Sequence, residues 1–184
     1  MATYRLILAL ALAGMTAVQA DALPPPAYQL AAAQAGIPAS VLFAIALQES
    51  GTPLRGHLIP WPWTLNVAGT AQRFARRDEA CAALRRELTR HDPKRIDVGL
   101  GQTNLGYHPE RYPTACDALD PRVNLAVTAE LLREHYAEVG DWVVAAGRYH
   151  RPAGGAPAAR YRKQFSRRWQ RIQAVVSIRE GSHP

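Results

Sequence analysis

The stretch Pro38-Ala-Ser-Val-Leu-Phe-Ala-Ile-Ala-Leu-Gln-Glu-Ser-Gly51 decides how this chain folds. Its residues from Val41 to Leu47 are all apolar, and a helix that is apolar on every side belongs in the interior of a domain. Pro38 suits the first position of such a helix, because the N–H that proline lacks has no helical partner there. The pattern therefore predicts a buried central helix that ends at residues 49–51.

Within this stretch, Glu49 is the residue that carries chemistry. A carboxylate at the end of an apolar helix loses hydration, and the negative end of the helix dipole opposes its charge. Both effects raise the pKa of a carboxyl, so Glu49 is expected to hold its proton near neutral pH. A carboxyl in that form is the general acid that cleavage of a glycosidic bond requires. The alternative is a Glu49 that points into solvent or pairs with an arginine such as Arg55.

The segments on either side of the central helix predict a second helix and a small sheet. Residues 27–35 are strong helix formers, and Gly36 stands where a left-handed residue closes a helix. Residues 61–67 and 72–74 read as two short strands around a turn. Residues 95–100 return to an extended pattern, and a third strand is expected to join this hairpin.

The remaining sequence predicts further helices. Asp78, Asp120 and Asp141 each stand where a side chain caps a helix, and residues 152–157 form a loop. In the last helix, apolar residues recur at helical spacing from Tyr161 to Val176, and basic residues cover the other faces. The fold class is therefore mainly α, an α+β domain with a small β hairpin or three-stranded sheet. A chain of 184 residues has no room for a second full domain.

The first residues predict an export signal. Arg5 precedes an apolar run over residues 6–12, and small residues then lead to Ala20, after which cleavage is expected, with Ala22 as the alternative site. That run is too short to span a bilayer, and later segments are interrupted by charge, proline or glycine. We therefore expect residues 1–20 to be a signal peptide and residues 21–184 to form a periplasmic domain with no stable membrane insertion.

The cysteines predict a disulfide. Cys81 and Cys116 are the only two, both lie after the signal, and an exported chain meets oxidants that join such pairs. A metal site is the alternative, but neither a C-x-x-C spacing nor clustered histidines support it, so no metal is expected.

The positive charge does not choose a substrate. The formal net charge is +7, which suits either attraction to an anionic polymer or an ordinary solvated exterior. A nucleic-acid partner is not expected, since no helix-turn-helix, zinc or RNA-binding signature accompanies the charge.

Several blocks stand in an order that carries a family resemblance. They are Ala44-Ile-Ala-Leu-Gln-Glu-Ser-Gly51, Asp97-Val-Gly-Leu-Gly-Gln-Thr-Asn104, Ala145-Ala-Gly-Arg-Tyr-His150 and Ala159-Arg-Tyr-Arg-Lys-Gln-Phe165. The first resembles the catalytic Glu-Ser motif of family 1 lytic transglycosylases, which have a goose-lysozyme-like fold. The others resemble that family's Gly-Leu-Met-Gln motif, its Ala-Tyr-Asn-Ala-Gly motif and its tyrosine-bearing final helix. The segment Pro60–Val67 is similar to the branch that accompanies conjugation, type IV pili and secretion machines.

The resemblance implies roles for the residues around the acid. Glu49 is the acid and then the base, and Ser50 makes a hydrogen bond in its vicinity or to the substrate. Tyr149 orients Glu49 or the N-acetyl group of the sugar, and Tyr161 supports the same wall. Without the resemblance, Ser50 is expected to donate a hydrogen bond to backbone carbonyls at the end of the helix. Both tyrosines are then expected to be aromatic residues of the core whose hydroxyls are hydrogen-bonded.

The second and third blocks add residues to the substrate groove and depart from the family. Gln102 and Asn104 are implied to line the groove, or else they stabilise the turn after a strand. Gly101 replaces the family's methionine, and His150 replaces its asparagine, so the shape of the groove is expected to differ. His150 titrates near physiological pH and is a candidate for tuning activity, or it makes a local hydrogen bond only.

The implied activity is cleavage of peptidoglycan between N-acetylmuramic acid and N-acetylglucosamine, without a cofactor. Glu49 protonates the glycosidic oxygen, the N-acetyl group assists, and Glu49 then deprotonates the C6 hydroxyl to close a 1,6-anhydro ring. Expected partners are glycan strands and components of a conjugation, pilus or secretion machine. One alternative is a hydrolytic muramidase, which needs a second carboxylate, for which Asp97 is the candidate. Another is a non-catalytic wall-binding component of a secretion apparatus.

Overall fold

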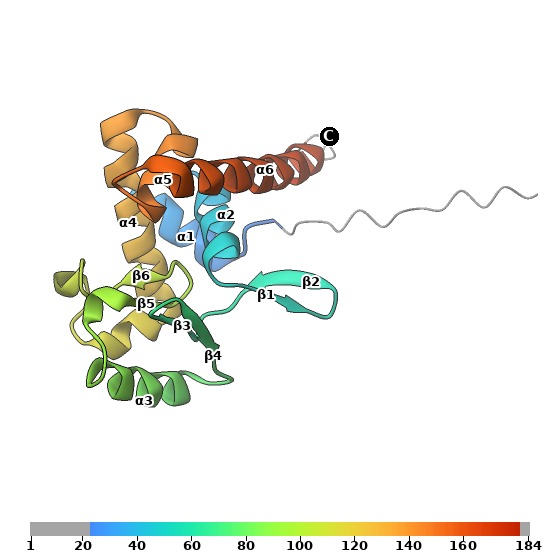
Figure 1. Ribbon diagram of the computed structural model, residues 1–184. Helices are drawn as coiled ribbons and strands as arrows, with labels where there is room; N and C mark the ends of the chain where they lie inside the picture. Colours follow the sequence, from blue (N-terminus) through green and yellow to red (C-terminus); the bar gives the residue numbers. More distant parts are fainter. Residues whose placement is uncertain (1–22, 181–184) are drawn as a thin grey trace, which may run out of the picture.

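A computed structural model describes residues 23–180 of the chain, with side chains up to residue 178. The predicted signal peptide, residues 1–20, lies outside this range. The described residues form a lobe of helices and a smaller lobe that contains a sheet, with a separate hairpin beside them (Figure 1). The mainly α, α+β fold class predicted from the sequence is confirmed.

The helical lobe is built around α2. Its members are α1 (Pro26–Ala35), α2 (Ala39–Glu49), α4 (Pro121–Val139), α5 (Trp142–His150) and α6 (Gly155–Glu180). Val41 to Leu47 are all buried in α2, as their uniform apolarity predicts. Helices α1, α4 and α6 pack around this core. The buried helix thus sets the position of Glu49 at its last residue.

The sheet lobe holds four short antiparallel strands in the order β4-β3-β5-β6. They are β3 (Thr64–Val67), β4 (Thr70–Arg73), β5 (Ile96–Val98) and β6 (Thr103–Asn104). The expected hairpin and third strand are β4-β3-β5, and β6 adds a fourth strand. Helix α3 (Arg77–Leu88) packs on the lobe, and three 3₁₀ turns connect its parts. These turns are η1 (Pro93–Arg95), η2 (Pro109–Arg111) and η3 (Ala115–Leu119).

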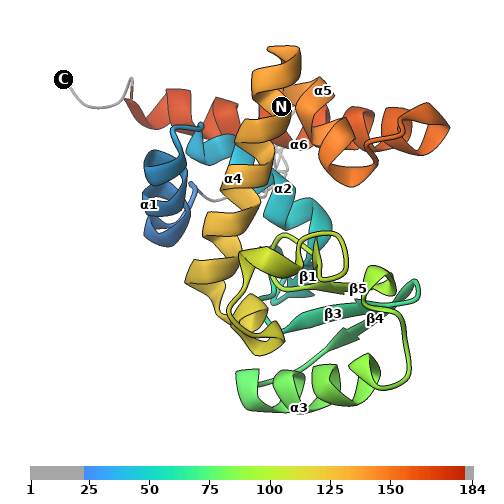
Figure 2. The same cartoon turned by 90° about the vertical axis from the view of Figure 1, so that its left-hand side faces the viewer.

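Helix α4 joins the two lobes. Leu125, Ala129 and Leu132 pack in the core of the helical lobe, whereas Val127 and Leu131 pack in the core of the sheet lobe. In the view of Figure 2, α4 rises from the sheet lobe to the far end of the helical lobe. One rigid helix therefore contributes to the cores of both lobes.

A hairpin that was not predicted from the sequence lies directly after α2. Strands β1 (Gly51–Leu54) and β2 (His57–Pro60) pair antiparallel around Arg55 and Gly56, whose φ angles are 49° and 80°. Two central residues with positive φ make the type of turn that suits a two-residue hairpin loop. The signal was an Arg-Gly pair, which is weaker than the usual Asn-Gly.

Helix boundaries confirm some predicted caps and correct others. The Asp120 and Asp141 side chains accept backbone N–H groups at the starts of α4 and α5, as predicted. Asp78 lies inside the first turn of α3 and makes no cap there. Pro38 occupies the N-cap of α2, one residue before the predicted position.

The loop predicted over residues 152–157 ends earlier than expected, because α6 begins at Gly155. Pro157 lies in the first turn of α6, where its missing N–H breaks no helical hydrogen bond.

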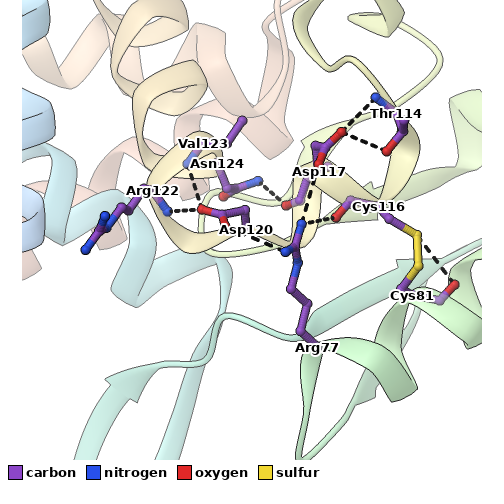
Figure 3. Close-up of polar contacts among 10 residues, drawn as sticks. Arg77, Cys81, Thr114, Cys116, Asp117, Asp120, Arg122, Val123 and Asn124 are labelled. Carbon is purple, nitrogen blue, oxygen red and sulfur yellow. Dashed lines mark hydrogen bonds and ion pairs between the residues drawn. A yellow bond between two sulfur atoms is a disulfide. The ribbon is translucent and has the colours of Figure 1, made fainter.

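A polar network around the disulfide ties α3 to the start of α4 (Figure 3). Cys81 and Cys116 are joined, with 5.3 Å between their Cα atoms, so the predicted disulfide is confirmed. The Arg77 guanidinium donates to the Cys116 carbonyl at 3.1 Å and lies 3.8 Å from the Asp120 carboxylate. The crosslink and the ion pairs therefore hold α3 against η3.

Two surface features bear on membrane and polymer binding. No single helix among residues 23–180 is long and apolar enough to cross a membrane. The pair α1 and α2 passes such a test only when taken together, and the two are bent by 118°. On α6, Arg160, Lys163 and Arg167 are exposed, in agreement with the expected basic exterior.

Candidate active site

Glu49 ends α2 and is held by a tyrosine from α6. The Tyr161 hydroxyl donates to Glu49 Oε1 at 2.6 Å, and the Glu49 side chain keeps partial exposure to solvent. Burial raises the pKa of Glu49 to about 7, the Tyr161 hydrogen bond opposes that rise, and the charge of Asp97 adds to it. The site thus presents a carboxyl that titrates near neutral pH. No ion pair to Glu49 occurs within residues 23–180, so the alternative of a pairing with Arg55 finds no support.

Ser50 positions Glu49 from inside the protein. Its side chain has 0% exposure, and its hydroxyl lies 3.0 Å from the Ala46 carbonyl oxygen and 2.8 Å from the Leu100 carbonyl oxygen. Both acceptors are backbone groups, so the structural role for Ser50 is the one observed. A direct contact with substrate, which the resemblance also allowed, is closed to a fully buried hydroxyl. The Leu100 bond ties the end of α2 to the turn between β5 and β6.

That turn contains the second motif. Gln102 has a φ of 49°, and its Nε2 donates to the Gly99 carbonyl at 2.8 Å and to the Thr64 carbonyl at 3.2 Å. Its amide N–H groups therefore stabilise the turn. Gly101 is in such close contact with Thr128 that an added Cβ would overlap the threonine hydroxyl. The family's methionine has no room at position 101, so Thr128 explains the glycine.

Asn104 and Asp97 lie side by side across the sheet. Asn104 Nδ2 donates to Asp97 Oδ1 at 2.8 Å and to the Lys94 carbonyl at 3.0 Å. Burial raises the pKa of Asp97, whereas the amide bonds from Asn104 and Asn66 and the charge of His150 oppose that rise. Asn104 is therefore placed to hold a carboxylate.

The two tyrosines contact different parts of the site. The Tyr149 hydroxyl donates to the Gly101 carbonyl at 2.6 Å, so it supports the motif turn and makes no hydrogen bond to Glu49. Tyr161, expected to support the same wall, is the residue whose hydroxyl donates to Glu49. Burial raises the pKa of both phenols well above their ordinary value, and the charge of Glu49 adds to this. Both hydroxyls therefore remain hydrogen-bond donors.

His150 stacks on Tyr161 at the surface of the site. The ring centroids are 4.4 Å apart, and the planes meet at 9°. Burial lowers the pKa of His150, the charge of Asp97 opposes this, and Arg151 adds to it. The histidine thus stacks on the tyrosine that bonds Glu49, and the charge of Asp97 acts on it.

Asn66 is a site residue that was not predicted from the sequence. Its Nδ2 donates to Asp97 Oδ2 at 3.1 Å, and it lies in β3 between the buried Leu65 and Val67. A polar residue between two buried apolar ones in a strand points to the opposite face of the sheet. That alternation was the available signal.

Other parts of the described structure offer fewer reactive side chains to a ligand. Residues 23–180 hold no group of three or more histidine, cysteine, aspartate or glutamate side chains that could bind a metal ion. A hollow of about 460 Å³ lies between α1 and α4, and half of its lining residues are alanines. Its charged residues, Glu130 and Arg133, include a glutamate already paired with Arg111. Glu49, by contrast, has a raised pKa and lies close enough to Asp97, Tyr149 and Tyr161 for their charges to affect one another.

Comparisons of the chain with protein-family models, curated proteins and solved structures found no match. The resemblance to family 1 lytic transglycosylases therefore depends on the quoted motifs. The contacts among Glu49, Tyr161, Tyr149 and the Gly99–Gln102 turn show that all four quoted motifs meet in space.

Proposed function

We propose that this protein is a lytic transglycosylase that cuts peptidoglycan glycan strands, with Glu49 as the acid and then the base. The observation that carries the proposal is the Glu49 carboxyl itself, whose pKa is raised to about 7 by burial and whose Oε1 accepts the Tyr161 hydroxyl. A general acid works best when its pKa lies near the operating pH. With Oε1 occupied by Tyr161, the other oxygen is the one suited to carry the proton.

In the first step, Glu49 gives its proton to the glycosidic oxygen between N-acetylmuramic acid and N-acetylglucosamine. The bond from that oxygen to the muramyl carbon breaks, and positive charge develops on the sugar ring. The family chemistry implies that the N-acetyl group of the same sugar assists. Glu49 is left as a carboxylate that still accepts the Tyr161 hydroxyl.

In the second step, Glu49 takes the proton from the C6 hydroxyl of the muramyl sugar, and that oxygen bonds to the muramyl carbon. The product carries a 1,6-anhydro ring, and Glu49 regains its proton. The attacking hydroxyl belongs to the sugar, so it has the entropic advantage of an intramolecular nucleophile. No water is consumed, and no cofactor takes part.

The setting that we propose is the periplasm, where cleavage would open the wall for a conjugation, pilus or secretion machine. The motif over Pro60–Val67 supports this, because it is similar to the branch that accompanies such machines. The Cys81–Cys116 disulfide supports export, since disulfides persist in oxidising compartments.

Digestion of purified sacculi by wild-type protein and Glu49→Gln tests the activity. Wild type is expected to release fragments with 1,6-anhydromuramic ends, lighter by one water than muramidase products, and Glu49→Gln is expected to release none. Mass spectrometry of the fragments reads the result. Glu79→Gln is the matched control, because Glu79 is an exposed residue of α3 that pairs with Arg76. A Glu49→Gln protein that is folded and as active as wild type would refute Glu49 as the acid.

Hydrolysis is the second candidate, because the charge of Asp97 reaches Glu49 and a muramidase needs two carboxylates. Digestion in ¹⁸O-labelled water separates the two reactions. A transglycosylase puts no label in its products, whereas a hydrolase forms labelled reducing ends.

A further inference from the structure

A row of three polar side chains crosses the sheet next to Glu49. The strand register places Asn66 opposite Asp97 and Asp97 opposite Asn104. Their strand neighbours Ile96 and Val98 are buried in the core of the sheet lobe, so the polar row occupies the other face. The carboxylate thus lies between two amides, one on each side.

Both oxygens of Asp97 accept an amide N–H. Asn104 Nδ2 donates to Oδ1 at 2.8 Å, and Asn66 Nδ2 donates to Oδ2 at 3.1 Å. Asn104 is fixed in this direction, because its own Oδ1 accepts the backbone N–H groups of Gly106 and Tyr107. Hydrogen bonds of this kind favour the ionised form of a carboxylic acid. The row is therefore built to hold a negative charge at one place.

The row also contains an acceptor without a donor. Asn66 Oδ1 is buried and has no hydrogen-bond partner in the described structure. A buried polar atom without a partner costs free energy on folding. The fold thus keeps the Asn66 side-chain N–H directed at Asp97, although the amide oxygen stays without a donor.

The row belongs to the same site as Glu49. The bond from Ser50 to the Leu100 carbonyl joins the end of α2 to the chain that leaves β5, and the charge of Asp97 acts on both Glu49 and His150. Glu49 has no ion pair and accepts a hydrogen bond from one hydroxyl, that of Tyr161. Asp97 accepts hydrogen bonds from two side-chain amides. Environments that differ in this way split a pair of carboxyls into an acid and an anion.

We propose that Asp97 is a second catalytic group of this site, a fixed anion that stabilises the positive charge developing on the muramyl sugar, with Asn66 and Asn104 as its positioning residues. The proposal rests on the proposed function. It differs from a nucleophilic or water-activating Asp97, because both oxygens already serve as acceptors for amides and no bond to carbon forms. The reaction and its atoms remain as in the two steps above.

The test compares Asp97→Asn and Asp97→Glu with wild type on sacculi. Asp97→Asn removes the charge, and we expect kcat to fall about 100-fold while the products keep their 1,6-anhydro ends. Asp97→Glu keeps the charge but displaces it, so an intermediate rate is expected. Asp78→Asn is the matched control, because Asp78 is an exposed residue of α3, and its kcat should equal that of wild type.

A second measurement needs no substrate. The ¹³C signal of the Glu49 carboxyl, followed by NMR against pH, should report a lower pKa in Asp97→Asn than in wild type, because the neighbouring negative charge is gone. Asp97→Glu should restore part of the wild-type value, and Asp78→Asn should leave it unchanged. The same spectra show whether each variant is folded.

Three outcomes would overturn the proposal. A folded Asp97→Asn with the wild-type rate would make Asp97 structural, and an unchanged Glu49 titration would remove the electrostatic contact. Labelled reducing ends that wild type forms in ¹⁸O water and Asp97→Asn does not would make Asp97 the base of a hydrolase. Failure of the proposed function is distinguishable from these, because it would appear as wild-type protein that cuts no glycan while the Glu49 titration still responds to Asp97→Asn.

Discussion

Replacing Glu49 with glutamine should make the protein more stable at alkaline pH. The pKa of Glu49 is about 7 in the folded protein, against an ordinary value of 4.5 that applies when the chain is unfolded. A carboxyl whose pKa is raised by folding favours the folded state fully below its unfolded pKa. This contribution is lost as the pH rises through the folded pKa. Glutamine has no proton to lose, so it avoids the loss.

The size of the effect follows from the two pKa values. They differ by roughly 2.5 pH units, and each unit corresponds to about 1.4 kcal/mol. The free energy of unfolding of Glu49→Gln, minus that of wild type, should therefore rise by about 3 kcal/mol between pH 4.5 and pH 8. Tyr161 keeps an acceptor in the amide oxygen, so the comparison isolates the charge.

Urea denaturation of both proteins, followed by circular dichroism from pH 4.5 to pH 9, measures the difference. Glu79→Gln, at an exposed position of α3, should differ from wild type by a nearly constant amount over the same range. A Glu49→Gln difference that stays flat with pH would show that the folded environment does not disfavour the carboxylate. Glu49 would then have no raised pKa and would not be suited to act as an acid at neutral pH.

Two further predictions concern the residues that hold the site together. Tyr161→Phe removes the 2.6 Å hydrogen bond that favours the ionised form of Glu49, so the pKa of Glu49 and the alkaline limb of the pH–rate profile should move up by roughly one to two pH units. A limb that stays in place or moves down would contradict this contact. Cys81→Ser opens a loop of sequence separation 35 and should lower the free energy of unfolding by about 3 kcal/mol, measured by urea denaturation, with little change in cleavage at 25 °C. Equal stability of the variant and the oxidised wild type would show that the crosslink does not contribute.

The elements predicted from the sequence are those whose causes lie within a few residues. An all-apolar run makes α2 a buried helix, and aspartates before helical segments cap α4 and α5. The raised pKa of Glu49 belongs to the same class, since it follows from burial at the end of that helix. The disulfide was predictable by count, because only one pairing of two cysteines exists. Local spacing and composition are enough for such features.

The contacts that define the site join residues far apart in the chain, and only the tertiary structure decided them. Tyr161 and Glu49 are 112 residues apart, and their hydrogen bond depends on how α6 crosses α2. No local pattern distinguishes Tyr161 from Tyr149 as the partner of the acid, since both are aromatic residues at helical positions. The same holds for Asn66, whose neighbour Asp97 follows from the pairing of β3 with β5. Helix packing and strand register depend on the fit of whole surfaces, and a one-dimensional pattern records the surfaces but not which of them meet.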